Sequence, residues 1–395
     1  MKRTEKPGFT IIELLVVVSI IALLVGMLLP AINEARDQAQ INVSHANLHN
    51  LGVAHVSYAA AWKDRQFTLI KDNIANYGSN TGAFNTYYEA SGGETAFHTH
   101  PGPILGWAYL HGDPSSQYLL FAYYTHESGD EQHGGFNPAN ASLNMPISFE
   151  TINEYFGAFR LPNVRQFNQY VSHKFYDKVF YAPKDQIILE TITSGGYDGA
   201  NMFEDPGEYS DRPVVSGQGE IPVWSSYCLS PAGMFNPAVM AHDDPSDGTF
   251  NGWRDPWTLS GGFRSPGLSQ AQYPSLKSHM LEHHWLQNKR NNCNQGFAGS
   301  GYIDDCEPYY FNHALESNPV TLFYDGHVEM VGVRDMMHAD ARIRTQTGNE
   351  NWGLWSQDTS YGADGYLIEY GYDLAATSFH ILTTDGIRGR DMLSD

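Results

Sequence analysis

Hydrophobic side chains are concentrated at the start of the chain. From Leu14 to Ile32 no residue is charged, and at ~1.5 Å per helical residue this run roughly matches the thickness of a bilayer core. The basic residues Lys2, Arg3 and Lys6 precede it. The pattern therefore predicts a membrane-spanning helix with a short cytoplasmic N-terminus and a body on the other side of the membrane.

A helical pattern continues beyond the apolar run, up to about residue 62. Apolar residues recur there with Gln, Asn and His between them, which predicts a helix with one buried stripe. The stripe consists of Ala39, Val43, Ala46, Val53, Val56 and Ala60. Pro30 lacks a backbone N–H, so we expect the helix to kink or melt locally there.

From Asp64 onward the helical period mostly disappears. Short runs of β-branched and aromatic residues, bounded by Gly, Pro, Asn and Asp, predict strands. These strands are expected at 67–70, 117–124, 178–181, 186–189, 320–324 and 327–331, with short helices at 149–159 and near 335–342 and long loops at 193–220 and 242–270. The predicted fold class is α+β: a long N-terminal helix packed on an antiparallel sheet with long loops.

Composition narrows the range of functions. A chain of 395 residues is long enough for one large domain or two modest ones. The net charge of −21 repels phosphate backbones, and no Lys/Arg stripe is present, so we expect no nucleic-acid partner. The acidity also suits divalent cations or high salt, although solubility alone explains it.

The N-terminal segment differs from an ordinary secretory signal. Its apolar run is longer than the usual signal, and no small-x-small cleavage site follows it. In addition, the acidic Glu13 lies at the start of the run, where an ionisable group is costly in hydrocarbon and requires a partner.

The stretch from Gly8 to Val17, Gly-Phe-Thr-Ile-Ile-Glu-Leu-Leu-Val-Val, resembles the cleavage and methylation motif of type IV pilins and pseudopilins. The resemblance implies that a prepilin peptidase cuts after Gly8 and methylates the new N-terminal residue, Phe9. It also implies that Glu13 pairs with the N-terminal amine of a neighbouring subunit. Such a pair compensates a carboxylate in the membrane and sets the register between subunits.

The resemblance implies an organisation for the whole chain. Residues 1–8 are expected to be a leader peptide, 9–32 a transmembrane and assembly helix, 33–62 its continuation, and 63–395 an extracytoplasmic globular domain. The expected function is structural and not enzymatic: a subunit of a type IV pilus-like or type II secretion pseudopilus-like filament. Its expected partners are the prepilin peptidase, the inner membrane, and other copies or other pilin-like subunits, and the filament would lie in the periplasm or at the cell surface.

A second resemblance involves both ends of the chain. The stretch from Asn47 to Tyr58 is similar to one found in a large group of bacterial pilin-like proteins, whose C-terminal signature is a His, nine residues, then Asp-Gly. Here eleven residues separate His313 from Asp325 and Gly326, so the spacing departs from the signature by two. Asp325-Gly326 itself predicts a tight turn between two strands.

Several residues suggest chemistry with less specific patterns. His279-Met-Leu-Glu-His283 matches the spelling of inverted zinc peptidases, whose chemistry requires a helix that places both histidines on one face. Because the chain has 17 histidines, a chance match in a structural element is favoured. A metal-dependent hydrolase, or a glycan-binding or adhesin domain that uses the helix as an anchor, is the alternative to a filament subunit.

Two further patterns concern ions and cysteines. Oxygen-rich loops suit calcium, so Asp304, Asp305 and Glu307 are a candidate site, although solvated turn carboxylates are the default and no other cofactor is expected. Three cysteines rule out a full disulfide framework. The sequence allows one disulfide between Cys293 and Cys306, and it equally allows three buried free thiols.

Overall fold

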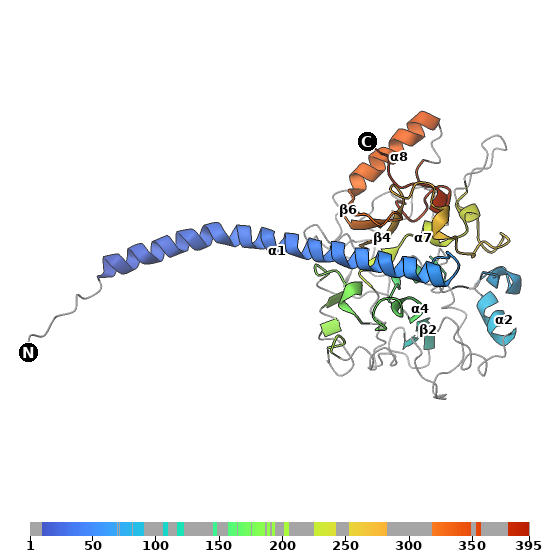
Figure 1. The fold of residues 1–395 in the computed structure, drawn as a ribbon, viewed down its shortest axis with the longest axis horizontal. Helices are drawn as coiled ribbons and strands as arrows, with labels where there is room; N and C mark the ends of the chain where they lie inside the picture. Colours follow the sequence, from blue (N-terminus) through green and yellow to red (C-terminus); the bar gives the residue numbers. More distant parts are fainter. Residues whose placement is uncertain are drawn as a thin grey trace, which may run out of the picture.

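In the computed structural model, one long helix projects from a mixed body (Figure 1). The structure describes residues 10–68, 70, 72–80, 82–90, 106–109, 117–121, 145–147, 157–163, 165–174, 176–185, 188–189, 192–193, 201–204, 225–241, 253–282, 318–348, 353–356 and 378–394.

Helix α1 runs from Ile11 to Ala61, with Thr10 as its N-cap and Trp62 as its C-cap (Figure 1). Pro30 lies inside this helix. The expected local melting is wrong, because the helix continues through Pro30 and bows gently instead (Figure 1). One proline removes a single i→i−4 hydrogen bond, and the turns on both sides retain theirs.

The body contains a four-stranded antiparallel sheet in the order β3-β4-β5-β6. A separate antiparallel pair joins β1 to β2. With α1, these sheets confirm the α+β fold class. The strands are β1 Gly106–Tyr109, β2 Gln117–Phe121, β3 Tyr227–Leu229, β4 Ser278–Glu282, β5 Val320–Phe323 and β6 Val328–Met330.

Short helices lie between these strands along the chain. The longest after α1 is α8, and many of the others are single 3₁₀ turns. Their bounds are η1 Ile74–Tyr77, α2 Ala83–Ala90, η3 Ala158–Arg160, α4 Arg165–Asn168, η4 Lys178–Phe180, α7 Pro231–Met234, η6 Pro237–Val239, η8 Leu268–Gln270, α8 Val333–Thr347 and η12 Gly386–Arg388.

One face of the second half of α1 packs against the sheet, in contact with β4, β5 and β6. The closest approach is at Gly52, where an added Cβ would lie 2.9 Å from Cδ2 of Leu322. A side chain at this position would have to displace the end of the Leu322 side chain, so the glycine allows close packing of the helix backbone on Leu322 of β5. The buried residues of α1 are Ser44, Leu48, Leu51, Ala54, His55, Tyr58 and Ala59.

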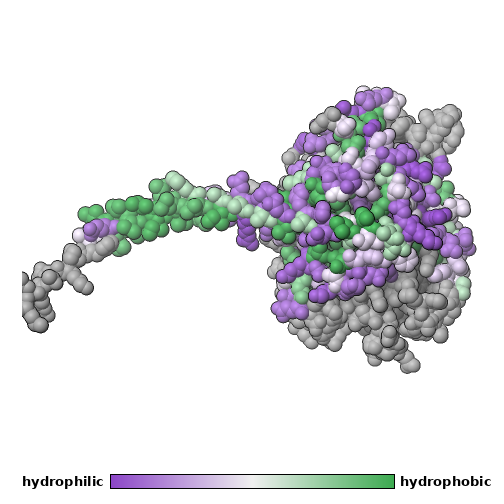
Figure 2. All heavy atoms as spheres, viewed as in Figure 1, coloured by the Kyte–Doolittle hydropathy of each residue, from purple (hydrophilic) through white to green (hydrophobic). Residues whose placement is uncertain are grey.

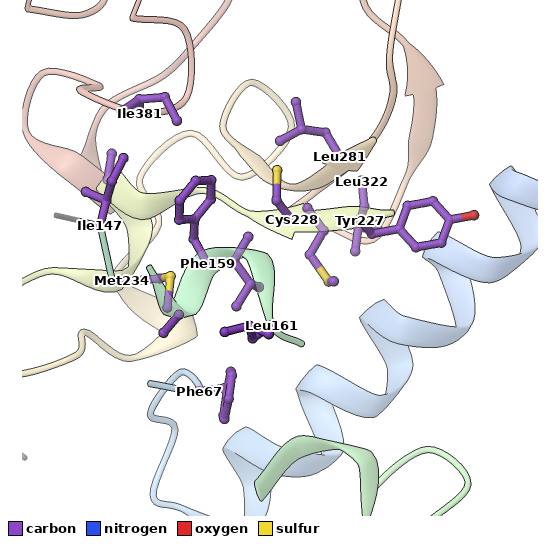
Figure 3. Close-up of a cluster of buried hydrophobic side chains, with 14 of the residues drawn as sticks. Phe67, Ile147, Phe159, Leu161, Tyr227, Cys228, Met234, Leu281, Leu322 and Ile381 are labelled. Carbon is purple, nitrogen blue, oxygen red and sulfur yellow. The ribbon is translucent and has the colours of Figure 1, made fainter. Parts of the chain in front are cut away.

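The core fills the space between α1, the sheet and the irregular segments. In Figure 3, Phe67 and Leu161 lie near α1, and Phe159 and Cys228 lie in the adjacent part of the cluster. Cys228 is a fully buried free thiol, and burial raises its pKa. Such a thiol packs as a small hydrophobic side chain and is inert.

The end of the chain belongs to the same core. Lys277, just before β4, places its Nζ 2.7 Å from Oδ2 of Asp391, and both side chains are fully buried. The same Nζ donates to Ser230 Oγ at 2.8 Å and Thr383 Oγ1 at 2.9 Å. Although burial opposes ionisation, Lys277 and neighbouring hydroxyl donors hold the pKa of Asp391 below its ordinary value. Losing one partner would leave an unpaired buried charge, so this pair ties the C-terminal segment to β4.

Several predicted elements are confirmed. Strands β2, β5 and β6 and helix α8 lie where the sequence predicts them. Gly326 closes the β5–β6 turn with φ +91°, and its N–H donates to the carbonyl of Phe323. The described part of 242–270 is irregular, as expected, and ends in η8. Only residues 157–159 of the helix expected at 149–159 are described, and only 193 and 201–204 of the loop expected at 193–220.

Three predicted strands are wrong, and two of them are replaced by capped turns. Residues 178–180 form η4, because the side chain of Asp177 accepts a hydrogen bond from Val179 N at 2.9 Å. Ile188 and Leu189 are helical, and Asp185 accepts from Ile188 N at 3.3 Å. Aspartate side chains bond to nearby backbone N–H groups, which favours such turns over the hydrogen bonds of a β-sheet. The described residues of 67–70 lie outside any strand, with Phe67 and Ile70 buried in the core.

Candidate functional site

The N-terminal end of α1 is held by a capping box. Thr10 N and Thr10 Oγ1 each donate to Oε2 of Glu13 at 2.8 Å, and Glu13 N donates to Thr10 Oγ1 at 3.3 Å. Thr10 is extended (φ −86°, ψ 151°), as a residue that begins a helix requires. The carboxylate also lies at the positive end of the helix dipole. Glu13 therefore stabilises the start of its own helix.

The geometry of this cap leaves part of the carboxylate available. Both donors from Thr10 bind Oε2 of Glu13. Among the described residues, none donates to Oε1, and a carboxylate has about four acceptor positions. An ammonium group can therefore approach Glu13 without disrupting the helix cap.

The first half of α1 exposes its apolar side chains on all sides. Figure 2 shows them as a continuous hydrophobic band that stands away from the body. In the described structure this apolar segment is not buried against the body, and the helix is long and apolar enough to cross a membrane. The exposed side chains include Leu14, Leu15, Ile20, Ile21, Leu23, Leu24, Met27, Leu28, Leu29 and Ile32.

A polar cluster fixes the second half of α1 on the sheet. Ser44 Oγ donates to Glu282 Oε1 at 2.5 Å and lies 2.9 Å from the hydroxyl of Tyr227. Asn47 Nδ2 donates to the same hydroxyl at 3.2 Å, and Val320 N donates to Glu282 Oε2 at 3.1 Å. Figure 3 shows the ring of Tyr227 directed toward α1. Directional bonds of this kind define one seating of the helix on β3, β4 and β5.

Two buried histidines continue the same interface. The rings of His55 on α1 and His279 on β4 lie 4.3 Å apart between centroids, and His279 stacks on Tyr324 at 4.4 Å. Phe67 N donates to His55 Nε2 at 3.3 Å. Burial lowers the pKa of His55 to about 3, and burial first, then His55 and Lys277, lowers the pKa of His279. Both rings are therefore neutral in the folded protein at neutral pH.

This arrangement contradicts the zinc-peptidase interpretation. Residues 279–282 lie on strand β4, whereas that chemistry requires a helix with both histidines on one face. The register of β4 shifts between Ser278 and Met280, the kind of irregularity that re-aims a side chain. His279 contacts α1, and Glu282 accepts from Ser44. His283 lies outside the described residues.

The predicted buried stripe of α1 is also wrong. All six of its residues, Ala39, Val43, Ala46, Val53, Val56 and Ala60, are exposed, and Val53 and Val56 retain 56% and 61% of their accessible surface. The buried face lies on the opposite side of the helix and includes Ser44 and His55. The prediction assumed that polar residues face solvent. On the buried face, however, Ser44 and His55 contact polar side chains of the sheet.

The remaining candidate residues lie in different places. Asp325 and Gly326 form the β5–β6 turn, where Asp325 Oδ1 lies 2.5 Å from His327 Nδ1. Within the described ranges, no group of three His, Cys, Asp or Glu side chains is placed to hold a metal. Outside the described residues lie Gly8, Phe9, Asp304, Asp305, Glu307, His313, Cys293 and Cys306, so the calcium, disulfide and histidine-signature expectations stay predictions.

Comparison with known proteins identifies the N-terminal region alone. A family model described as the prokaryotic N-terminal methylation motif matches residues 5–29. No curated protein and no solved structure matches the chain. The chain therefore carries a prepilin-type N-terminal motif and is type IV pilin-like in this region. The match includes residues 5–8, the capping box and most of the exposed apolar segment, and it stops well before the body.

Proposed function

We propose that this protein is a structural subunit of a type IV pilus-like or type II secretion pseudopilus-like filament. The observation that carries the proposal is the pairing of a methylation motif with an apolar helical segment that nothing in the described body covers. Such a segment requires lipid before assembly and other apolar helices afterwards. The large body suggests a minor or pseudopilin-like subunit.

Processing is proposed to prepare the N-terminus for the transfer of the apolar segment from lipid to the filament. A prepilin peptidase removes residues 1–8 by cutting after Gly8 and methylates Phe9. The new ammonium group lies next to Thr10, at the helix end that Glu13 already caps. In the filament, the free Oε1 of Glu13 accepts a hydrogen bond from the N-terminal ammonium group of a neighbouring subunit. A carboxylate in an apolar core is tolerated when it is paired and hydrogen-bonded in this way.

The topology follows from the same segment. The protein is proposed to cross the inner membrane once, with the basic residues Lys2, Arg3 and Lys6 on the cytoplasmic side before processing and the body outside. A charged group of residues, Glu34, Arg36 and Asp37, follows the apolar segment and is exposed, as expected at a membrane surface.

Intact-mass analysis of the protein from its native membrane tests this proposal. We expect loss of Met1–Gly8 and the added mass of one methyl group on Phe9, and Gly8→Ala should abolish both changes. Glu13→Ala should be processed normally but lost from filaments sedimented from the cell surface or periplasm. Glu34→Ala, which removes an exposed carboxylate from the same helix, is the matched control and should assemble normally.

Either of two results would contradict the proposal. An intact N-terminus in the wild-type protein would leave the segment as a simple membrane anchor. Cleavage beyond residue 32 would indicate an ordinary secreted protein. Equal incorporation of Glu13→Ala and Glu34→Ala would remove the assigned role of Glu13.

A further inference from the structure

The buried pair of Lys277 and Asp391 brings an amine into contact with a carboxyl group. Nζ of Lys277 lies 2.7 Å from Oδ2 of Asp391, and neither side chain is exposed to solvent. The backbone also holds the two residues together, since Asp391 N donates to the carbonyl of Leu276 at 2.8 Å. In the other ion pairs of the described residues, an arginine or a histidine takes the basic position. Lysine differs from both because its primary amine is a nucleophile that can be acylated.

The two oxygens of the Asp391 carboxyl group have different partners. Oδ2 accepts a hydrogen bond from Ser278 N at 3.0 Å and another from the hydroxyl of Ser278. Oδ1 accepts from Thr383 Oγ1 at 2.5 Å, and this hydroxyl oxygen accepts in turn from Lys277 Nζ at 2.9 Å. The amine is therefore connected to Oδ2 directly and to Oδ1 through Thr383, which keeps it close to the carbon between them.

We propose that Lys277 and Asp391 react within the folded protein to form an amide bond between Nζ and Cγ, with loss of one water molecule. The reaction needs no oxidant, reductant or activated co-reactant, because an ammonium and a carboxylate together contain all the atoms of an amide and a water. This inference does not depend on the proposed filament function. It assigns a covalent modification to a pair of residues that otherwise serves only as a buried ion pair.

The groups around the pair supply each step of the condensation. Lys277 begins as an ammonium and Asp391 as a carboxylate. One proton passes from Nζ through the Thr383 hydroxyl to Oδ1, and the neutral nitrogen then attacks Cγ with its lone pair. The tetrahedral intermediate carries its negative charge on Oδ2, where the N–H and hydroxyl of Ser278 stabilise it. A second proton follows the same route, the Cγ–Oδ1 bond breaks, and Oδ1 leaves as water while Oδ2 becomes the amide oxygen.

Burial favours the amide over the ion pair. In water, an amine and a carboxyl group are stabilised as hydrated ions, whereas at this site both charges have already lost their hydration. Burial lowers the pKa of Lys277 although Asp391 opposes the change, and the neutral amine therefore becomes easier to reach. Fixed contact adds to this effect, since well-oriented intramolecular reactions reach effective concentrations of about 10⁵ M or more.

The bond has a definite structural consequence. It joins the C-terminal segment covalently to the start of β4 and closes the chain between residues 277 and 391 into a loop. Strand β4 itself contacts α1 and pairs with β3 and β5. The C-terminal segment would then remain attached to the central part of the body even when the surrounding packing opens.

Peptide mapping of the full-length protein under denaturing conditions tests the proposal, because a denaturant disrupts an ion pair and leaves an amide intact. Trypsin does not cut after an acylated lysine. We therefore expect the peptide 265–289 joined to the C-terminal peptide 391–395, with a combined mass lower by one water molecule. Tandem mass spectrometry should place the junction at Lys277 and Asp391. Separate peptides 265–277, 278–289 and 391–395 without a joined product would overturn the proposal.

Three threonine variants test the proton route. Thr383→Val removes the hydroxyl but keeps the branched shape, and it should slow bond formation at least tenfold, because general acid–base catalysis contributes about 10²-fold or more. Thr383→Ser keeps the hydroxyl and should restore the rate to within about threefold of the wild type. Thr321→Val removes another buried hydroxyl, which donates to the carbonyl of Pro319, and it is the matched control that should react like the wild type.

The rate is measured as the fraction of joined peptide at intervals after a short pulse of synthesis, and tryptophan fluorescence checks that each variant folds. Joined peptides that form quickly in the wild type and slowly in Thr383→Val would support the bond and its mechanism. Equally fast formation in a folded Thr383→Val protein would contradict the route through Thr383. A loss of water located at any other residue would overturn the assignment. Processing and filament assembly are measured separately, so none of these results alters the test of the proposed function.

Discussion

The two halves of α1 form one helix but have opposite surroundings. The first half consists almost entirely of large apolar residues, and none of it is buried. The second half contains many Ala, Ser, Asn and His residues, and one of its faces is buried on the sheet. The more apolar half is therefore the exposed one. Apolar content predicts which surface needs to be covered, while the presence of partners decides whether the molecule itself covers it.

The docked half also shows how a helix of modest apolarity is held in one position. Leu48 and Leu51 supply apolar burial, and Ser44, Asn47 and His55 supply contacts with Glu282, Tyr227 and His279. Apolar packing tolerates small shifts along the helix axis, whereas hydrogen bonds to a buried carboxylate do not. Between Glu13 and Asn33 the first half has one polar side chain, Ser19, and its hydroxyl donates to the carbonyl of Val16 in the same helix, which fits the proposed exchange of lipid for other helices.

The largest expected effect comes from a matched pair of leucine truncations. Leu51→Ala removes a fully buried side chain between α1 and the sheet and should lower the free energy of unfolding of the body by about 3 kcal/mol. Leu24→Ala makes the same change in the exposed half and should leave this free energy within about 0.5 kcal/mol. Denaturant titration of the full chain in detergent, followed by tryptophan fluorescence, measures both. A similar loss in Leu24→Ala would show that the first half packs on the body.

Acid should weaken the docked half through its neutral histidines. Burial lowers the pKa of His55 from 6.5 to about 3, so below pH 6.5 the unfolded chain binds a proton that the folded chain does not. The stabilisation is complete above pH 6.5 and is lost as the pH falls toward 3, by about 1.4 kcal/mol per pH unit for this histidine. The neighbouring His279, whose pKa is also lowered, contributes to the same loss of stability in acid. The positive charge of Lys277 further disfavours protonation of His279.

Denaturant titrations at several pH values between 6.5 and 4 check this expectation. His55→Phe should reduce the pH slope by about one proton, while lowering stability at neutral pH because Phe67 N loses its acceptor. His49→Phe replaces an exposed histidine on the same helix and should retain the wild-type slope. An unchanged slope in His55→Phe would mean that His55 is protonated in the folded state or is not buried there.

The sequence predicts the first half of α1 better than the second. The charge-free run and Glu13 identify the exposed segment, because lipid imposes a simple compositional demand on a spanning helix. The same reasoning fails for residues 39–60, since it assumes that buried positions are apolar. Ser44 is buried because Glu282, far away along the chain, accepts its hydrogen bond. His55 is buried because the backbone N–H of Phe67, in the segment that follows the helix, donates to its ring. Contacts of this kind between distant residues cannot be predicted from the pattern of a single sequence.

In the body, turn signals explain which predicted strands are present. The Asp325-Gly326 turn fixes the β5–β6 hairpin, and both strands lie where the pattern predicts them. At 178–181 the run of apolar residues resembles a strand, but Asp177 caps a helical turn instead. The ion pair of Lys277 and Asp391 had no sequence signal at all, because its two members are separated by most of the last third of the chain.

The smallest expected effect concerns the beginning of the exposed half. Thr10→Ala removes the hydroxyl that donates to Glu13 and accepts from its N–H, so it disrupts the capping box without changing the apolar segment. We expect amide hydrogen exchange in the first turn, at residues 11–13, to accelerate about threefold to tenfold in detergent micelles. Thr10→Ser retains the hydroxyl and should exchange at the wild-type rate, while amides near Leu51 should not change in either variant. Unchanged exchange in Thr10→Ala would mean that the surrounding detergent, and not the cap, determines the order of this turn, and the two halves of α1 would then differ only in what covers them.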